Sequence, residues 1–288
     1  MRRLAAGPLW ALAAIVVLAA ALRLWRIGHQ SYWLDETFTA GIVRRDFGGM
    51  LHAVRHTEST PPLYYALAWL WERLFGWHEA ALRSLSAVFG VATVPAAYAA
   101  ARERVSERAA LMAAALFAVN AYLVWYSQEA RAYALLVLLC TLSLLFFLRA
   151  ERDGRGTWKW AVVSSLALLT HYFAALLVAP EAAWLLWRRR SRGVLLAAAA
   201  VAAVAGALLP LAIAQRNSGH TLFIADIPFG RRLVSLPKKL ATGELGTPTP
   251  VLGPAIGAAL AAGAVLALLR ARGAAGLLRL ATAGGLGV

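Results

Sequence analysis

Apolar runs of about twenty residues, separated by short basic linkers, constrain this sequence more than any other feature. A helix that crosses a bilayer needs roughly 20 mostly apolar residues. We read the apolar segment 160–187 as two helices, broken near His171. Counting it twice gives eight spans, and we expect an all-α, polytopic transmembrane helical bundle. The segments are about 8–24, 80–101, 109–126, 131–148, 160–187, 194–214 and 251–269.

The composition supports a membrane protein rather than a nucleic-acid-binding one. Hydrophobic residues make up 61% of the chain and charged residues 15%, whereas soluble domains carry about 25% charged residues. The formal charge of +15 would indicate a nucleic-acid partner in a soluble chain. Here the basic residues lie between apolar runs, so we assign the charge to membrane topology and expect no nucleic acid as partner. A single cysteine, Cys140, excludes an intramolecular disulfide.

Positive charge predicts the orientation, because short cytoplasmic loops hold an excess of Lys and Arg. A cytoplasmic N-terminus puts 16 of the 29 Lys and Arg residues inside. This count requires that 62–76 does not cross, and Glu72 and Arg73 indeed end its apolar stretch after about nine residues. We therefore expect 62–76 to be a re-entrant or interfacial helix in a long extracytoplasmic loop.

We divide the chain into a core at 1–190, which contains the extracytoplasmic loop 25–79, and a second part at 191–288. The second part is expected to hold further spans and an extracytoplasmic loop at 215–250. Its tail from Gly273 is punctuated by glycine and ends without a stop signal, and we expect either a cytoplasmic end followed by a partial helix or a truncated chain. The N-terminus also resembles a secretory signal, with Arg2 and Arg3 before an apolar stretch, but we expect it to remain as the first span.

Three polar clusters and a broken span fall on the extracytoplasmic side of this topology. The first contains Asp35 and Glu36 after an aromatic pair, and two adjacent acids supply either a general base or ligands for a divalent cation. The alternative is a helix N-cap, since Asp35 precedes a helix-like stretch at 37–54.

The second cluster surrounds the Pro61-Pro62 pair, whose fixed backbone holds Glu58 and His56 near the membrane surface, with Tyr64 beyond it. A simple loop before a helix explains the same prolines equally well.

The third cluster is the tight linker that contains Gln128, Glu129, Arg131 and Tyr133. Glu129 and Arg131 either pair and cap the next helix, or line a wet cavity in which Arg131 binds an anionic lipid phosphate. His171 and Tyr172 interrupt an apolar run at the same face, where a hydrogen-bonded structural histidine is the alternative.

Arg83 lies near the start of the second span and is another candidate phosphate ligand. The alternative is an interfacial arginine that snorkels toward the headgroups.

The order of these motifs resembles the GT-C superfamily of integral membrane glycosyltransferases. It is most similar to the bacterial, dolichyl-phosphate-mannose-protein mannosyltransferase-like branch, which is related to aminoarabinose transferases. The resemblance covers about residues 8–190 and rests on Trp-Leu-Asp-Glu, Glu-x-x-Pro-Pro-Leu-Tyr-Tyr, Phe-Gly, Ala-Leu-Arg, Tyr-Ser-Gln-Glu-Ala-Arg-x-Tyr and His-Tyr-Phe. Two departures are Thr60, where many relatives have histidine, and the short chain.

The resemblance implies a GT-C-type fold and an enzyme of the bacterial cytoplasmic membrane with an extracytoplasmic active site. Such an enzyme transfers a sugar from a polyprenyl-phosphate donor to a protein, lipid or glycan acceptor, with membrane lipid around it. Asp35 is then the general base, and Glu36 positions the acceptor or, with Asp35, a Mg²⁺ or Mn²⁺ ion. Substrate binding falls to the remaining candidates: His56, Glu58, Tyr64, Arg83, Gln128, Glu129, Arg131, Tyr133, His171 and Tyr172.

Two other functions remain open at this stage. A transporter or flippase of polyprenyl-linked or anionic solutes needs ionisable residues near helix centres, but the charges in this sequence cluster at helix ends. An inactive truncated paralogue is the third reading. If the chain is the enzyme, Asp35, Glu58, Glu129 and His171 converge on one cavity.

Overall fold

The computed structural model describes residues 6–217 and residue 230. This part of the chain is helical and contains no strand, as the sequence predicts. The helices are α1 (Ala6–Leu24), α2 (Leu34–Val43), α3 (Phe47–Thr57), α4 (Leu63–Phe75), α5 (Glu79–Arg102), α6 (Glu107–Val119), α7 (Ala121–Ser127), α8 (Tyr133–Asp153), α9 (Thr157–Thr170), the 3-10 helix η1 (Tyr172–Ala174), α10 (Ala175–Arg189) and α11 (Arg192–Asn217).

Four of these helices are long and apolar enough to cross a membrane by themselves, namely α1, α5, α8 and α11. They coincide with the predicted spans 8–24, 80–101, 131–148 and 194–214, so a long apolar helix is confirmed in each of these segments. The predicted span 251–269, and the predicted loop 215–250 beyond Asn217, lie outside the described residues apart from residue 230.

The remaining predicted spans, one in 109–126 and two in 160–187, lie in segments where the helix is broken. The segment 109–126 forms α6 and α7, which meet at a bend of 55°. At the bend the Asn120 side chain accepts the N–H of Leu123 at 2.9 Å and caps α7, a role that asparagine often takes at helix starts. The segment 160–187 forms α9 and α10, and the break lies at His171 as expected. With 14 and 15 residues, each of these helices is shorter than a typical span.

Arg23 stabilises the break between α6 and α7. Its guanidinium donates to the carbonyl oxygens of Phe117 and Ala118 at 3.0 and 2.9 Å and to Ser127 Oγ at 3.2 Å. A bend leaves the last carbonyls of α6 without intrahelical donors, and Arg23 supplies them. Gly90 makes room for this contact, because a Cβ atom there would lie 2.1 Å from Ser127 Oγ.

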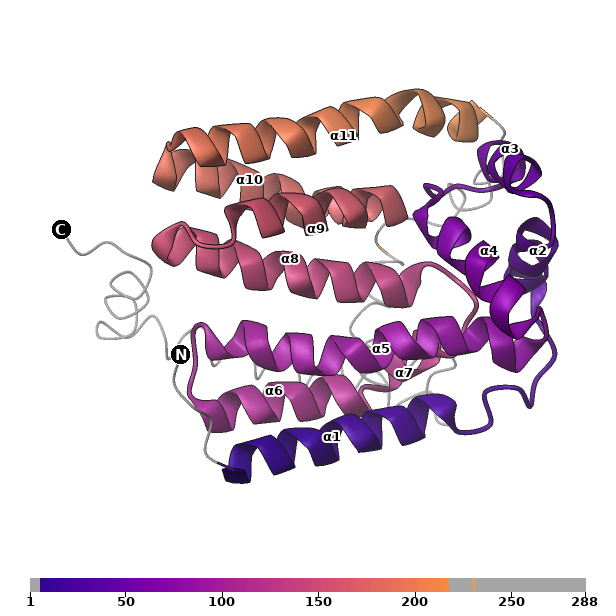
Figure 1. Ribbon diagram of the computed structural model, residues 1–288, viewed down its shortest axis with the longest axis horizontal. Coiled ribbons are helices and arrows are strands. Elements are labelled where there is room, and N and C mark those ends of the chain that lie inside the picture. The colour runs from indigo at the N-terminus through magenta and orange to yellow at the C-terminus, as the bar shows by residue number, and fades with distance from the viewer. Residues whose placement is uncertain (1–5, 218–229, 231–288) are drawn as a thin grey trace. The chain divides into compact units, whose positions relative to one another are not determined.

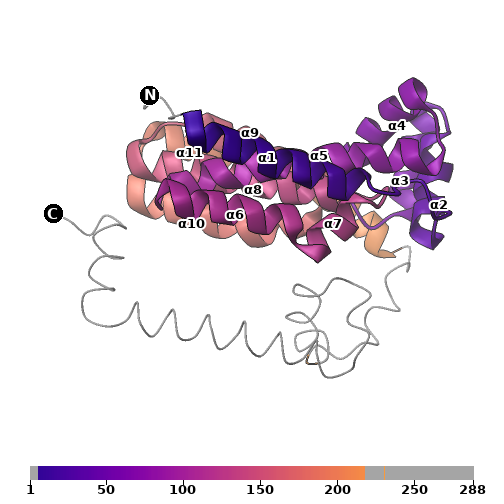
Figure 2. The same ribbon diagram turned by 90° about the horizontal axis from the view of Figure 1, so that it is seen from below.

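The short helices α2, α3 and α4 gather at one end of the bundle, where α1 ends and α5 begins (Figures 1 and 2). The segment 62–76 therefore forms α4 outside the bundle, as its interfacial assignment requires. The helix-like stretch 37–54 is not one helix but two, because α2 ends at Val43 and α3 begins at Phe47. All the helix-to-helix linkers that carry the candidate residues lie at this same end (Figure 1).

α11 packs against α9 and α10 and belongs to the same compact unit as the preceding helices. Within this bundle Glu181 departs from the expectation that charged residues sit at helix ends. It lies inside α10 with 4% of its surface exposed, and its Oε2 accepts from Ser143 Oγ at 2.6 Å and from Trp160 Nε1 at 2.9 Å. These bonds connect α10 with α8 and α9, so we interpret Glu181 as a polar link between three helices.

We predict that Arg23→Gln lowers the free energy of unfolding by about 3 kcal/mol, because the shorter amide cannot reach both carbonyls and hydrogen bonds to charged groups contribute about 1.5–3 kcal/mol each. Thermal or denaturant unfolding in detergent measures this loss. Arg55→Gln, on the exposed face of α3, is the matched control. Equal stability of the two variants would contradict the capping role of Arg23.

Candidate functional site

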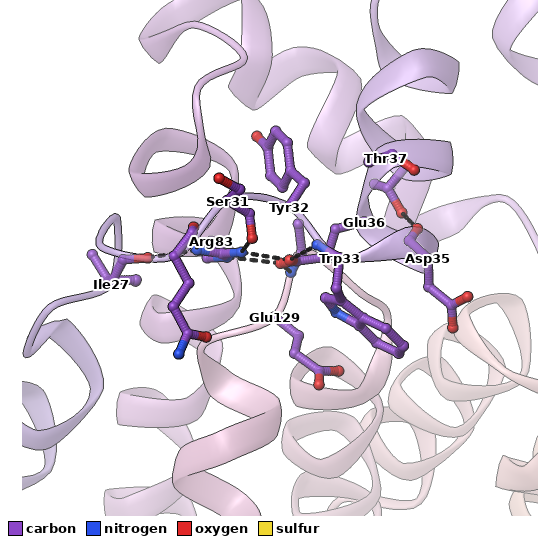
Figure 3. A network of polar contacts seen from close by, with 12 residues as sticks. Ile27, Ser31, Tyr32, Trp33, Asp35, Glu36, Thr37, Arg83 and Glu129 are labelled. Carbon is purple, nitrogen blue, oxygen red and sulfur yellow. Dashed lines mark hydrogen bonds and ion pairs between the residues drawn. The ribbon is translucent and has the colours of Figure 1, made fainter.

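A buried ion pair between Glu36 on α2 and Arg83 on α5 organises the loop that follows α1 (Figure 3). Arg83 Nε lies 2.8 Å from Glu36 Oε1, and Arg83 Nη2 lies 2.5 Å from Oε2. The exposed fractions are 5% for Arg83 and 0% for Glu36. Arg83 also donates to the carbonyls of Ile27, Gln30 and Ser31 at 2.7–3.1 Å. The guanidinium thus fixes residues 27–31 against the start of α5.

Glu36 uses both carboxylate oxygens in this arrangement. Besides Arg83, Oε1 accepts the backbone N–H of Ala130 at 2.9 Å and Oε2 that of Trp33 at 3.3 Å. The Trp33 contact is the half of a capping box in which the N3 carboxylate accepts the backbone N–H of the N-cap residue. Each Glu36 oxygen thus accepts two hydrogen bonds, and its expected role as a cation ligand beside Asp35 stays a prediction. Among the described residues, no three His, Cys, Asp or Glu side chains form a group suited to a metal.

A second ion pair joins Arg131, just before α8, to Glu58, just after α3. Arg131 Nη1 lies 3.2 Å from Glu58 Oε1 and 3.2 Å from the Tyr65 hydroxyl. It also donates to Thr39 Oγ1 and to the Asp35 carbonyl, both at 3.4 Å. Arg131 therefore pairs with Glu58 rather than with Glu129, and it joins α2, α4 and the start of α8.

Asp35 occupies the first turn of α2, and Trp33 is the N-cap residue. The N-cap alternative for Asp35 is therefore wrong. Its carboxylate points away from the Arg83–Glu36 pair (Figure 3), is partly exposed, and accepts no hydrogen bond within the described part of the chain. It lies in electrostatic range of Glu129, Arg131 and Tyr133. Asp35 is thus held by its backbone while its carboxylate stays open.

Glu129 carries a buried oxygen that has no hydrogen-bond partner. Oε1 accepts from Trp125 Nε1 at 2.5 Å, but Oε2 accepts no hydrogen bond, and the residue is 6% exposed. Burial raises the pKa of Glu129 to about 7; the Trp125 hydrogen bond opposes the shift and the Glu36 charge adds to it. An orphaned buried oxygen is costly, so it marks a place where a donor group can bind.

Glu129 lines a cavity of about 430 Å³ between the end of α1 and the start of α8. Its walls include the indoles of Trp25, Trp33 and Trp125. Arg26 and His29 also line the cavity, and the sequence reasoning did not single them out. Next to a span end they resemble ordinary interfacial residues, so only the tertiary fold shows that they share a cavity.

Gln128 takes a structural position at this cavity. Its amide nitrogen donates to the carbonyls of Leu22, Arg23 and Trp25 at 2.9–3.3 Å. These carbonyls belong to the last turn of α1 and the residue after it, where intrahelical donors are missing. Gln128, predicted to bind substrate, therefore caps α1 and fixes the loop that follows it.

His171 and Tyr133 lie close to Arg131. The ring centroids of Tyr133 and His171 are 6.1 Å apart, and His171 Nδ1 accepts the N–H of Phe173 at 3.2 Å. Burial, together with the charge of Arg131, lowers the pKa of His171 to about 4. The imidazole is therefore neutral at pH 7, and the Nδ1 contact places its proton on Nε2.

Tyr172 belongs to a link that the sequence reasoning missed. Its hydroxyl donates to Gln215 Oε1 at 2.7 Å, and Gln215 Nε2 donates to the carbonyls of Val54 and Thr60 at 2.9 Å each. Gln215 on α11 thus holds both sides of the Glu58 segment. The sequence offered one signal for this link, namely a glutamine near the end of an apolar run.

The two remaining candidates, Tyr64 and His56, differ in burial. Tyr64 is fully buried, and its hydroxyl contacts Ser86 Oγ at 3.3 Å. His56 lies on the exposed side of α3, with its ring centroid 4.5 Å from that of His52.

The four residues that were predicted to converge on one cavity gather around Arg131, but they do not all line the same cavity. Glu58 binds Arg131 directly, and Asp35, Glu129 and His171 lie within electrostatic range of that arginine. Of these four candidates only Glu129 is among the residues that line the cavity.

Comparison with known proteins shows similarity to one family. Residues 59–214 match the profile of the dolichyl-phosphate-mannose-protein mannosyltransferase family. No curated protein matches the sequence. The fold is similar to that of the S. cerevisiae protein O-mannosyltransferase Pmt1–Pmt2 complex bound to the sugar donor, with a TM-score of 0.56 and 20% sequence identity. The match covers 78% of this chain but 34% of the yeast chain, so this chain spans about a third of that protein.

We predict that Glu36→Gln destabilises the protein by about 3–5 kcal/mol, because it leaves the buried charge of Arg83 without a partner. Unfolding in detergent measures the effect. Glu72→Gln, which alters an ion pair on a more exposed part of α4, should cost about 1 kcal/mol or less. A cost for Glu36→Gln as small as that of Glu72→Gln would show that the Glu36–Arg83 pair does not organise the loop.

The raised pKa of Glu129 predicts a pH-dependent stability. An acid whose folded-state pKa lies above its ordinary value favours the fold at low pH, and this contribution is lost as pH rises through about 7. Glu129→Gln cannot ionise, so its stability relative to the wild type should improve by about 2–3 kcal/mol between pH 5 and pH 8.5. Melting temperatures at both pH values test this, and a pH-independent difference between the two proteins would contradict it.

Proposed function

The chain belongs to the dolichyl-phosphate-mannose-protein mannosyltransferase family, whose profile covers more than half of its residues, and we propose that it is a glycosyltransferase. In this proposal the protein moves a sugar from a polyprenyl-phosphate donor to an acceptor on the outer face of the cytoplasmic membrane. The sequence motifs, the bundle and the gathering of polar residues at one end support the assignment.

One observation carries the proposal: Asp35 is an open carboxylate on a fixed backbone. Glu36, the next residue, is locked to Arg83, and Arg131 binds the Asp35 carbonyl. The carboxylate itself accepts no hydrogen bond within the described residues, so its lone pairs are available to an acceptor. A general base must be positioned and still able to take a proton, and Asp35 meets both requirements.

The proposed reaction is a direct displacement with inversion at the anomeric carbon. Asp35 takes the proton of the acceptor hydroxyl or amine as that group forms a bond to the anomeric carbon. The bond from this carbon to the phosphate oxygen breaks, and the polyprenyl phosphate leaves with the electron pair. Cationic groups that neutralise the leaving phosphate lower the barrier.

Arg83 and Arg131, the arginines predicted to bind this phosphate, each have a buried carboxylate partner. We therefore assign them a positioning role: Arg83 fixes the loop around the cavity, and Arg131 fixes α2 and Asp35. The expected Mg²⁺ or Mn²⁺ ion stays a prediction. Both Glu36 oxygens already accept hydrogen bonds, so no step of the proposed reaction uses a metal ion.

The helices α2–α4 supply a surface suited to membrane lipid. Large apolar side chains are exposed on them, among them Phe38, Leu70, Leu74 and Phe75. Arg73 lies on the same helix as Leu70, Leu74 and Phe75, where it pairs with Glu72 and stacks over Trp69 with 3.7 Å to the ring centroid. Aromatic and basic residues are typical of the membrane interface, so the proposed site lies where a lipid-linked donor can reach it.

We predict that Asp35→Asn lowers sugar transfer by about 10²–10⁴-fold, the contribution typical of a general base, while membrane insertion and melting temperature stay unchanged. Transfer is measured with a panel of polyprenyl-phosphate sugars, and the products are identified by mass spectrometry.

Asp46→Asn is the matched control, because Asp46 is an exposed acid before α3 whose side chain makes no cap hydrogen bond. It should transfer sugar like the wild type. Wild-type turnover in Asp35→Asn would remove Asp35 from the mechanism.

A further inference from the structure

The cavity beside α1 combines charges that the mechanism above has not used. Arg26 and His29 line it together with the buried carboxyl of Glu129. Its volume of about 430 Å³ lies in the range of about 300–1,000 Å³ that small-molecule sites occupy. Aromatic walls with a few polar groups are also typical of such sites. The cavity therefore has the features of a ligand site.

Arg26 and His29 differ from the paired arginines of this region. Arg83 and Arg131 are buried and ion-paired, whereas Arg26 and His29 are exposed, and their side chains form no ion pair with another described residue. Arginine is well suited to bind phosphate, since its planar guanidinium donates two parallel hydrogen bonds. The Arg26 guanidinium and the His29 imidazole can each donate hydrogen bonds to an anion without losing an ion-pair partner.

The backbone holds Arg26 in an unusual conformation. Its φ of 53° lies in the left-handed region that non-glycine residues rarely adopt. Gln128, which binds the carbonyl of Trp25, and the hydrogen bond from the His29 N–H to the Arg26 carbonyl at 2.9 Å maintain it. Backbone strain that the surroundings enforce is often found at ligand sites, and here it fixes Arg26 at the cavity.

Glu129 supplies the complementary group. Its Oε2 is buried, accepts no hydrogen bond and belongs to a residue that lines the cavity. A hydroxyl group of a bound sugar would satisfy this oxygen. The nearby faces of Trp33 and Trp125 are apolar surfaces against which a sugar ring can pack.

We propose that this cavity binds the glycosyl phosphate headgroup of the lipid-linked donor, with the phosphate on Arg26 and His29 and a sugar hydroxyl on Glu129 Oε2. The identity of the donor rests on the proposed function, whereas the anion site rests on the cavity itself. Asp35 is not among the lining residues, and its carboxylate points away from the Arg83–Glu36 wall (Figure 3). An inverting displacement further requires that the base and the leaving phosphate lie on opposite sides of the anomeric carbon, so the bound donor has to extend from the cavity toward Asp35.

The test measures binding of undecaprenyl phosphate and undecaprenyl phosphate mannose to the full chain in detergent, by quenching of tryptophan fluorescence. Loss of one charged contact costs about 10- to 100-fold in affinity. Arg26→Gln should therefore weaken binding of both lipids by at least about tenfold. Glu129→Gln should weaken binding of the mannosyl lipid alone. Arg55→Gln removes the same charge from an exposed site and should leave both affinities unchanged.

Several outcomes would overturn the inference. They are absence of wild-type binding, wild-type affinity in Arg26→Gln, and an equal loss in Arg55→Gln. His29→Gln provides a second variant if Arg26→Gln does not fold, and it should also weaken binding of both lipids.

Sugar transfer, measured in parallel, separates this inference from the proposed function. Binding through Arg26 without any transfer by the wild type supports the anion site but contradicts the proposed function. Transfer with an unchanged KM in Arg26→Gln supports the proposed function but contradicts the anion site.

Discussion

The burial of Arg83 is the constraint on which the candidate site depends. A buried guanidinium is tolerated only with a carboxylate and enough acceptors, and Arg83 obtains them from Glu36 and from three carbonyls of the loop after α1. Since Glu36 also accepts the N–H of Ala130, one ion pair joins α2, α5, the loop and the linker before α8. These are the segments that surround the cavity and carry Asp35.

The second pair, Arg131 with Glu58, acts on the other side of Asp35 and has a different consequence. It fixes the chain entering α8 against α2 and α4 through contacts with Thr39 and Tyr65. In each pair the glutamate carboxylate neutralises the arginine guanidinium, so neither pair needs a bound substrate to be stable. The groups left open are Asp35, Glu129, Arg26 and His29. We therefore assign a positioning role to the residues of the two ion pairs, and we assign substrate contact to the residues outside them.

The sequence predicted the helices better than the contacts between them. Apolar length alone located α1, α5, α8 and α11, because the bilayer imposes it. The bend at Asn120 was not predicted, because Arg23, almost a hundred residues away, provides the donors that stabilise it. Likewise, Glu129 seemed a natural partner for Arg131, yet Glu58 holds that position. Such pairings depend on which helices pack together, and local spacing does not specify this. Glu181 was overlooked because one acid barely changes the hydropathy of α10.

An experimental structure with a non-hydrolysable polyprenyl-phosphate sugar analogue tests the account most directly. The account predicts the phosphate at Arg26 and His29, the sugar ring between Trp33 and Glu129, and the Asp35 carboxylate facing the anomeric carbon from the opposite side. The ion pairs of Glu36 with Arg83 and of Glu58 with Arg131 should remain unchanged. A phosphate bound to Arg83 or Arg131 with either ion pair opened, or a sugar placed out of reach of Asp35, would contradict it.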